Sequence, residues 1–184
     1  RLVSYMCEPL SRLICSRWPA SVKAESKPLP TIRSEDAHYI FAVHDAREYL
    51  VRTATAGFTM TKQGKVAAIG NLHPEFALRL ANAVRQARLA GMHKAGIFSA
   101  YRPPSFGVGG FADKHNSLHA YGIAVDMTGI GRPGSSDARL WHYIATANKL
   151  YNPYGPYHRA EWNHYQPTGI TIITSGHPLR ATIT

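Results

Sequence analysis

The stretch that decides the fold is SLHAYGIAVD, residues 117–126. Three apolar residues separate Gly122 from Asp126, which predicts a short buried strand that follows a glycine turn. The turn lets His119, which precedes it, fold back toward the carboxylate at the end of the strand. The stretch therefore predicts a turn and strand that direct His119 and Asp126 toward one point.

Helical and strand patterns alternate on both sides of this stretch. Capping residues and apolar periodicity predict helices from Ser34 to about Val51, from Pro74 to Gly91, and from Ser135 or Ser136 onward. The last of these is expected to bury Leu140, Trp141, Ile144 and Ala147. Short strands are expected at 65–69, 95–99, 123–127, near 159–165 and at 170–174. The mixture predicts an α+β fold, with helices packed on a small, mostly antiparallel sheet.

A chain of 184 residues falls in the range of one main domain. Residues 1–33 are predicted to form an amphipathic helix followed by a proline-rich arm. Residues 34–184 are predicted to form the functional domain. Cys7 and Cys15 either form a disulfide in an oxidising compartment or serve as small apolar residues on a helix face. No run approaches the roughly 18 to 20 apolar residues that a membrane span needs, so the chain is expected not to be transmembrane.

The basic excess points to a polyanionic partner. Lys and Arg number 21 against 11 Asp and Glu, a formal charge of +10. Nucleic acid, anionic lipid and cell-wall polymers would all satisfy this charge. The basic residues are scattered singly and no nucleic-acid-binding motif frames them, so we expect no nucleic-acid function.

A second polar motif, Glu161-Trp162-Asn163-His164, follows about forty residues after His119. A spacing of three places Glu161 and His164 on one side of a tight turn, so that one binds a metal and the other lies over the open coordination position. Two histidines and one carboxylate leave the fourth position of a zinc ion for water, as in catalytic rather than structural sites.

Such a site hydrolyses an acyl bond by a general mechanism. Zinc lowers the pKa of water from about 15.7 toward about 7, and a carboxylate outside the metal's ligands takes the proton. Glu161 is the candidate for this base. Arg102, in the loop after the strand at 95–99, is the candidate for stabilising the oxyanion that forms.

Three motifs, in the same order along the chain, resemble those of a known enzyme family. SLHAYGIAVD resembles the SxHxxGxAxD signature of the D-alanyl-D-alanine carboxypeptidase and dipeptidase family of zinc peptidases, which share a metal site with lysostaphin-type enzymes and hedgehog domains. Residues 99–103, SAYRP, are similar to the family's S-x-Y-R segment, and residues 161–164 to its ExxH segment. The resemblance covers about Ser99 to Gln166.

The resemblance implies a role for each matched residue. It implies His119, Asp126 and His164 as zinc ligands, Glu161 as the general base and acid, and Arg102 as the transition-state stabiliser. Ser117 matches a substrate-contacting position, although a turn residue is an equal alternative, and Tyr101 either lines the pocket or packs. The implied substrates are peptidoglycan stem peptides, which implies an exported protein of the bacterial periplasm or cell envelope.

Because the sequence departs from the family pattern in two places, the resemblance does not identify which bond is cleaved. The tryptophan follows Glu161 here, whereas the family has it directly before the histidine, and residues 105–116 form a glycine-rich insertion. The expected enzyme is a carboxypeptidase or an endopeptidase that acts on D-Ala-containing stem peptides or crosslinks. The enzyme alternatives are an endopeptidase for another cell-wall bond and a cytoplasmic D-Ala-D-Ala dipeptidase. The alternative of another class is a non-catalytic zinc-binding module. Nothing in the sequence sets the oligomeric state.

Overall fold

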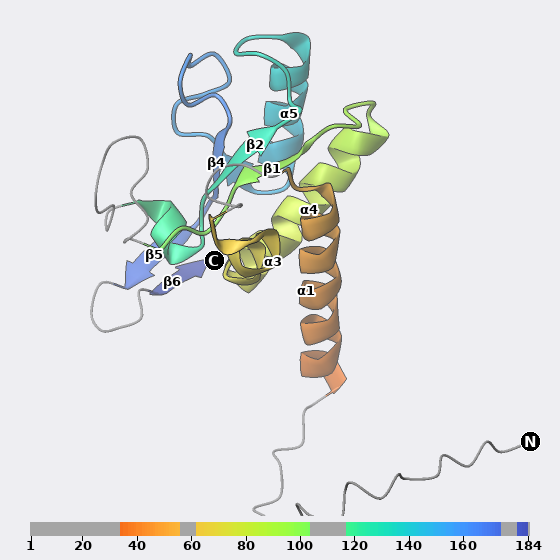
Figure 1. The fold of residues 1–184 in the computed structure, drawn as a ribbon, viewed down its shortest axis with the longest axis vertical. Helices are drawn as coiled ribbons and strands as arrows, with labels where there is room; N and C mark the ends of the chain where they lie inside the picture. Colours follow the sequence, from red (N-terminus) through yellow and green to blue (C-terminus); the bar gives the residue numbers. More distant parts are fainter. Residues whose placement is uncertain (1–33, 56–61, 104–116, 174–179, 184) are drawn as a thin grey trace, which may run out of the picture. The chain divides into compact units, whose positions relative to one another are not determined.

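A computed structural model describes residues 34–55, 62–103, 117–173 and 180–183 (Figure 1). The elements in chain order are α1 (Ser34–Thr53), α3 (Lys65–Gly70), α4 (Pro74–Leu89), β1 (Gly96–Ser99), the 3₁₀ helix η3 (Leu118–Tyr121), β2 (Val125–Thr128), α5 (Ser136–Ala147), β3 (Leu150–Tyr151), β4 (His164–Pro167), β5 (Ile170–Ile173) and β6 (Arg180–Ile183).

Four of the strands form one sheet in the order β1-β2-β4-β3, and every neighbouring pair is antiparallel. Strands β5 and β6 pair with each other in a separate antiparallel ribbon. Together with the helices, these sheets confirm the predicted α+β class.

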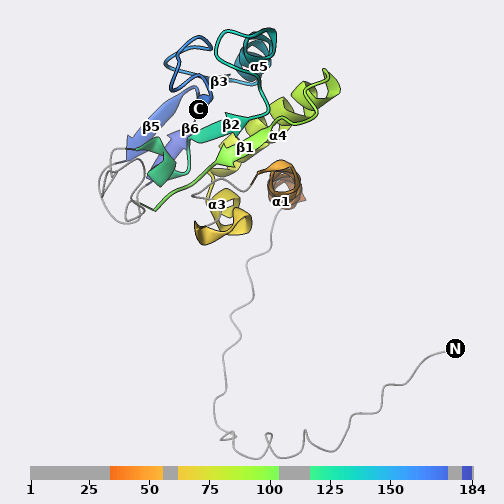
Figure 2. The same ribbon diagram turned by 45° about the horizontal axis from the view of Figure 1, so that its top comes forward.

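Helix α4 is the centre of the hydrophobic core. Pro74 stands in its first turn, where a missing N–H costs nothing. Its buried face includes Phe76, Leu80 and Val84, as the periodicity predicted. Helices α1 and α5 both contact α4, which lies between them in Figures 1 and 2. Each large side chain buried in this way contributes about 1.5 to 3 kcal/mol to folding.

Helix α5 covers the sheet beside α4. The Ser135 hydroxyl accepts a hydrogen bond from the Ala138 N–H at 3.2 Å, so the predicted cap is present. Trp141 is fully buried and meets Tyr165 of β4 edge-on, with ring centroids 5.6 Å apart. Leu140 and Ala147 are exposed, contrary to prediction, because the inward face is centred on Trp141 and Ala145.

The expected strand at 65–69 is wrong, because this segment forms helix α3. Its consecutive buried residues, Ala68 and Ile69, do not alternate as a strand would, and Val66 is exposed. The strand expected near 159–165 begins only at His164. Strands β3 and β6 were not predicted.

Several sequence predictions lie outside the described residues. These are the helix and arm of residues 1–33 with Cys7 and Cys15, and the glycine-rich insertion up to Asn116. Among the residues that the structure does describe, no helix has both the length and the apolar character of a membrane span.

Candidate metal centre

Asp126 and His164 are brought together by the register of the sheet. Asp126 of β2 stands directly opposite His164 of β4. Directly opposed residues of antiparallel strands have Cβ atoms about 4.5 to 5.5 Å apart on the same face. The His164 Nδ1 atom accordingly lies 3.2 Å from Asp126 Oδ1. Their neighbours Val125 and Tyr165 point to the opposite, buried face.

His119 reaches the same point from η3. Gly122 ends this short helix with a left-handed φ of 69°, which favours glycine. A side chain at Gly122 would also collide with the backbone, because its Cβ would lie 2.2 Å from the Asn71 carbonyl oxygen. The resulting turn leads directly toward β2 and places His119 Nε2 at 3.4 Å from Asp126 Oδ1.

The tautomer of His119 is set by its other nitrogen. His119 Nδ1 lies 2.8 Å from the Ala100 carbonyl oxygen, which only accepts hydrogen bonds, so Nδ1 donates. In the neutral ring, the Nε2 lone pair then faces the Asp126 carboxylate. Nε2 is buried and has no hydrogen-bond partner within the described part of the chain. Two acceptors at this separation need a proton or a cation between them.

The three donor atoms fit a zinc ion in their chemistry and spacing. Donor atoms of His119, Asp126 and His164 all lie within 4.8 Å of one another. Ligands about 2.0 to 2.1 Å from a tetrahedral zinc ion are about 3.3 Å apart. The separations of 3.4 Å and 3.2 Å to Asp126 Oδ1 match this edge.

Electrostatics favour an ionised Asp126. Burial raises the pKa of Asp126, but its interactions with His119 and His164 lower it more. The net effect holds the pKa well below its ordinary value. Asp126 is therefore an anionic ligand candidate across the whole physiological range of pH.

Arg102 faces the same region from the loop after β1. Its backbone N–H donates to the His119 carbonyl at 3.2 Å, which ties this loop to η3. Burial lowers the pKa of the Arg102 guanidinium, and the nearby carboxylates of Asp126 and Glu161 oppose the shift. The cation thus lies within the electrostatic reach of both carboxylates.

Glu161 is held by its backbone at the start of a turn. Its carbonyl accepts from His164 N–H at 3.2 Å and from Asn152 Nδ2 at 2.8 Å. Its own N–H donates to His158 Nδ1 at 3.0 Å, so His158 is engaged here. Among the described residues, the Glu161 carboxylate is not one of the converging donors of the three-residue group. Its carboxylate is therefore not a candidate ligand of this group.

The remaining predicted residues flank the site. Ser117 is the half-buried N-cap of η3 and makes no capping hydrogen bond with its side chain. Tyr101 is half-buried, and its backbone contacts lead to Ala68 of α3 and to Gln63.

The displaced tryptophan belongs to the scaffold. Trp162 Nε1 donates to the Gly131 carbonyl at 3.2 Å, and the ring packs against the core. The next residue, Asn163, exchanges hydrogen bonds with the backbone of Met127. These contacts extend the pairing of β2 with the segment before β4 and fix the turn that carries Glu161.

The loop between β3 and β4 contributes two further residues, of which the sequence reasoning did not single out Asn152. Asn152 is buried, and its Oδ1 accepts from the N–H groups of Tyr154 and Gly155 at 2.8 and 3.1 Å. The Tyr154 ring stands edge-on to that of His164, with centroids 6.2 Å apart. The Asn-Pro pair at 152–153 signals such a side-chain turn, but nothing local predicts the contact with His164.

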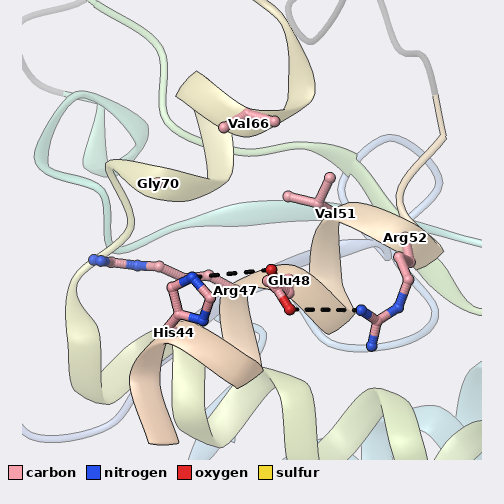
Figure 3. A pocket seen from close by; sticks show the side chains of 7 residues that line it. All are labelled: His44, Arg47, Glu48, Val51, Arg52, Val66 and Gly70. Atoms are coloured by element: carbon pink, nitrogen blue, oxygen red, sulfur yellow. Dashed lines mark ion pairs between the residues drawn. The ribbon is translucent and has the colours of Figure 1, made fainter. Parts of the chain in front are cut away.

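A second group of possible donors, His44, Asp45 and Glu48, lies exposed on α1. Of this group, His44 and Glu48 line a cavity of about 400 Å³ between α1 and α3 (Figure 3). Glu48 lies between His44 and Arg52, 3.9 and 3.8 Å away, in ion pairs along the helix. These contacts are typical of a solvated helix surface, where such pairs contribute little.

Scans of this chain against protein-family models and against curated proteins found no match. The case for a function therefore depends on the residues and on the geometry described above.

Proposed function

We propose that this protein is a zinc-dependent peptidase that hydrolyses a peptide bond in bacterial peptidoglycan. The observation that carries the proposal is the approach of His119 Nε2 and His164 Nδ1 to Asp126 Oδ1, at 3.4 and 3.2 Å, in a group whose donor atoms all lie within 4.8 Å of one another. The buried Nε2 of His119, which has no hydrogen-bond partner among the described residues, also supports it.

The chemistry that zinc supplies in such sites is a lowered pKa for water, from about 15.7 to about 7, and polarisation of a carbonyl oxygen. Glu161 takes a proton from the attacking water as oxygen adds to the scissile carbonyl carbon. It then returns that proton to the amine nitrogen as the C–N bond breaks. A general base in this position contributes about 10²- to 10⁴-fold to turnover.

Arg102 supplies the positive charge for the developing oxyanion. Its proximity to both Asp126 and Glu161 supports this role. A single group of this kind is worth about 10²- to 10³-fold in rate. Without substrate, the positive charge of Arg102 offsets the repulsion between the carboxylates of Asp126 and Glu161.

Peptidoglycan is proposed as the substrate from the three ordered motifs and the charge of the chain. The motifs at 99–103, 117–126 and 161–164 resemble those of the D-alanyl-D-alanine peptidase family. Stem peptides carry free carboxylates, so the net charge of +10 would assist their encounter with the protein. The corresponding proposals are a hedgehog-like peptidase fold and a location in the cell envelope.

The test separates the base from the ligands. Zinc content and hydrolysis of purified cell-wall fragments are measured for Glu161→Gln, Asp126→Asn and the control Glu48→Gln, whose side chain is exposed on α1. Glu161→Gln should keep zinc and lose about 10²- to 10⁴-fold in turnover. Asp126→Asn should lose zinc and activity together, and Glu48→Gln should lose neither.

The same measurements identify the failures of the proposal. A fully active Glu161→Gln protein would overturn the role of the base. If the wild type binds zinc but releases no product from any fragment, detected by mass spectrometry, the protein is a zinc-binding module without catalysis.

A further inference from the structure

The cavity between α1 and α3 has two walls of different chemistry (Figure 3). One wall is a stripe of α1 whose members have the three- and four-residue spacing of one helix face, at positions 44, 47, 48, 51 and 52. The other wall is Val66 and Gly70 of α3, which are also four residues apart. The volume of about 400 Å³ falls within the range of about 300 to 1,000 Å³ that is typical of ligand sites. None of the lining residues is a candidate ligand of the metal centre.

Arg47, in the stripe of α1, is a half-buried cation. Its Nη2 donates to the Leu72 carbonyl at 2.6 Å, and its Nε is buried without a hydrogen-bond partner in the described part of the chain. Among the side chains that the structure describes, no carboxylate forms an ion pair with it. Burial lowers the pKa of its guanidinium, and Tyr39 opposes this shift. The guanidinium has therefore lost hydration without gaining an anion from these side chains.

The other charges of the cavity compensate each other. Glu48 lies 3.8 Å from Arg52, and Figure 3 shows the Arg47 and Arg52 guanidinium groups on opposite sides of Glu48. With a neutral His44, the lining is left with the single positive charge of Arg47. One negative charge on a ligand neutralises it. A dianion would leave a surplus negative charge beside Glu48, so the electrostatics favour a monoanion.

The rest of the lining suits an apolar ligand body. Val51 of α1 and Val66 of α3 contribute methyl groups from the two walls, and Val66 is 73% exposed. Gly70 leaves room beside them, because a Cβ at this position would meet no described atom within 4 Å. An aliphatic chain or a ring in this space would remove apolar surface from water on both sides.

We propose that this cavity binds a small monocarboxylate with an aliphatic or aromatic body, and that the carboxylate pairs with the Arg47 guanidinium. The carboxylate accepts charge-assisted hydrogen bonds from N–H groups that the Leu72 carbonyl does not use. The apolar body lies against Val51 and Val66 and fills the space beside Gly70. This ligand site goes beyond the proposed peptidase function and does not depend on it.

The test titrates the protein as purified with hexanoate, acetate and hexanamide and follows the NMR shifts of its backbone amides. Hexanoate carries both the charge and the apolar chain, whereas acetate has the charge without the chain and hexanamide the chain without the charge. The Kd of hexanoate should be at least about 10-fold lower than that of either other compound, because each lacks one of the two interactions. The shift changes that hexanoate causes should concentrate at residues 44–52 and 66–72.

Gly70→Phe tests the location from the uncharged wall. The φ of Gly70 is not among the left-handed ones, and the new side chain enters space that no described atom occupies, so the fold should be retained. The added ring fills the place of the apolar body, and hexanoate binding should weaken at least about 10-fold. Asn82→Phe adds the same ring to the exposed surface of α4 and should leave the Kd unchanged.

Arg47→Met tests the charged wall, because it removes the cation and keeps an apolar stem. Hexanoate binding should weaken at least about 10-fold, and hexanamide binding should change less than about 3-fold, since the neutral amide needs no cation. Arg139→Met, which removes an exposed arginine from α5, is the matched control and should bind hexanoate as the wild type does.

The outcomes decide the proposal in each case. It is refuted if hexanoate does not bind, or if it binds no more tightly than acetate or hexanamide. Shift changes centred on His119 and His164 would place the carboxylate at the candidate metal centre and refute the cavity as its site. An unchanged Kd in folded Gly70→Phe or Arg47→Met protein also contradicts the proposal. If one of these variants does not fold, the other variant and the comparison of the three compounds decide.

Discussion

Gly122 is the residue on which the position of His119 depends most directly. It combines a left-handed φ of 69° with a backbone neighbour, the Asn71 carbonyl, at the place where a Cβ would stand. Gly91, after α4, has a φ of 99° but open space around it. Substituting each glycine therefore distinguishes the free-energy cost of the left-handed conformation, present at both positions, from the cost of a collision, present only at Gly122.

We expect Gly91→Ala to lower the free energy of unfolding by about 1 to 2 kcal/mol, the cost of a left-handed conformation for alanine. Gly122→Ala should cost more than this, because the Asn71 backbone cannot move aside as a flexible side chain would. Urea denaturation measures both. Zinc affinity should fall only in Gly122→Ala, and equal losses of stability would contradict the role of the close contact.

His73 gives the fold a specific dependence on pH. It precedes α4 and its N–H donates to the Gly122 carbonyl at 2.9 Å. Burial lowers the pKa of His73, and the charges of Arg47 and Arg79 lower it further, while Glu75 opposes them. The unfolded chain, with a histidine pKa of about 6.5, then binds more protons than the folded chain at mildly acidic pH.

Because the unfolded state binds more protons, stability falls as the pH drops from about 7 through about 6.5 and below. His73→Gln should flatten this dependence between about pH 7 and pH 5. The measurement is urea denaturation at several pH values with a chelator present, so that metal binding does not contribute. His93→Gln, an exposed histidine after α4, is the matched control. Equal slopes for wild type and His73→Gln would refute the prediction.

At the scale of elements, the loop between β3 and β4 depends on one buried amide. Asn152 fastens the beginning of the loop through Tyr154 and Gly155 and its end through the Glu161 carbonyl. The loop thereby holds Tyr154 against His164 and holds Glu161 at the turn.

Asn152→Ala should lower the free energy of unfolding by about 1 to 3 kcal/mol, because it removes three hydrogen bonds that a buried side chain makes to the backbone of the loop. It should also lower kcat more than it raises KM, since Glu161 loses its fixed position. Asn71→Ala is the control, because the Asn71 amide is exposed and, within the part of the chain that the structure describes, donates to the Ala67 carbonyl at 2.8 Å. If Asn152→Ala lost stability alone and kept its kcat, the amide would be structural only.

Local patterns predicted the elements far better than their pairing. The starts of α4 at Pro74 and α5 at Ser136 follow from capping and periodicity, and both are confirmed. The prediction of a strand at 65–69 was wrong, because five residues are too few to distinguish a strand from a helix by periodicity. Strand β3 has only two residues, so no pattern could reveal it.

The same limit applies to the candidate site. The sequence analysis could predict that His119 and Asp126 lie close together, because one glycine turn within residues 117–126 joins them. The pairing of Asp126 with His164 depends on the register of two four-residue strands, and a shift by one residue would reverse the faces. The proximity of Arg102 to Glu161 depends on that register as well.

At the scale of the whole molecule, the metal is expected to act as a stabilising ligand. A zinc ion that binds only the folded chain adds about 2.7 kcal/mol at a concentration 100 times its Kd. Thermal denaturation at increasing free zinc should therefore show a rising Tm, which a chelator reverses. His119→Ala should abolish the rise, and His44→Ala, in the exposed group on α1, should preserve it. A Tm that does not change with the zinc concentration would contradict the assigned site.

The separation of the paired strands also bears on the order of folding. Asp126 and His164 are 38 residues apart in the chain, and their contact forms only when β2 and β4 have met. Contacts between distant segments close slowly, because the loop between them loses its entropy first. If the pair forms after the rate-limiting step, zinc will leave the refolding rate nearly unchanged and slow the unfolding rate. The metal would then determine the lifetime of the native state rather than the speed at which the chain reaches it.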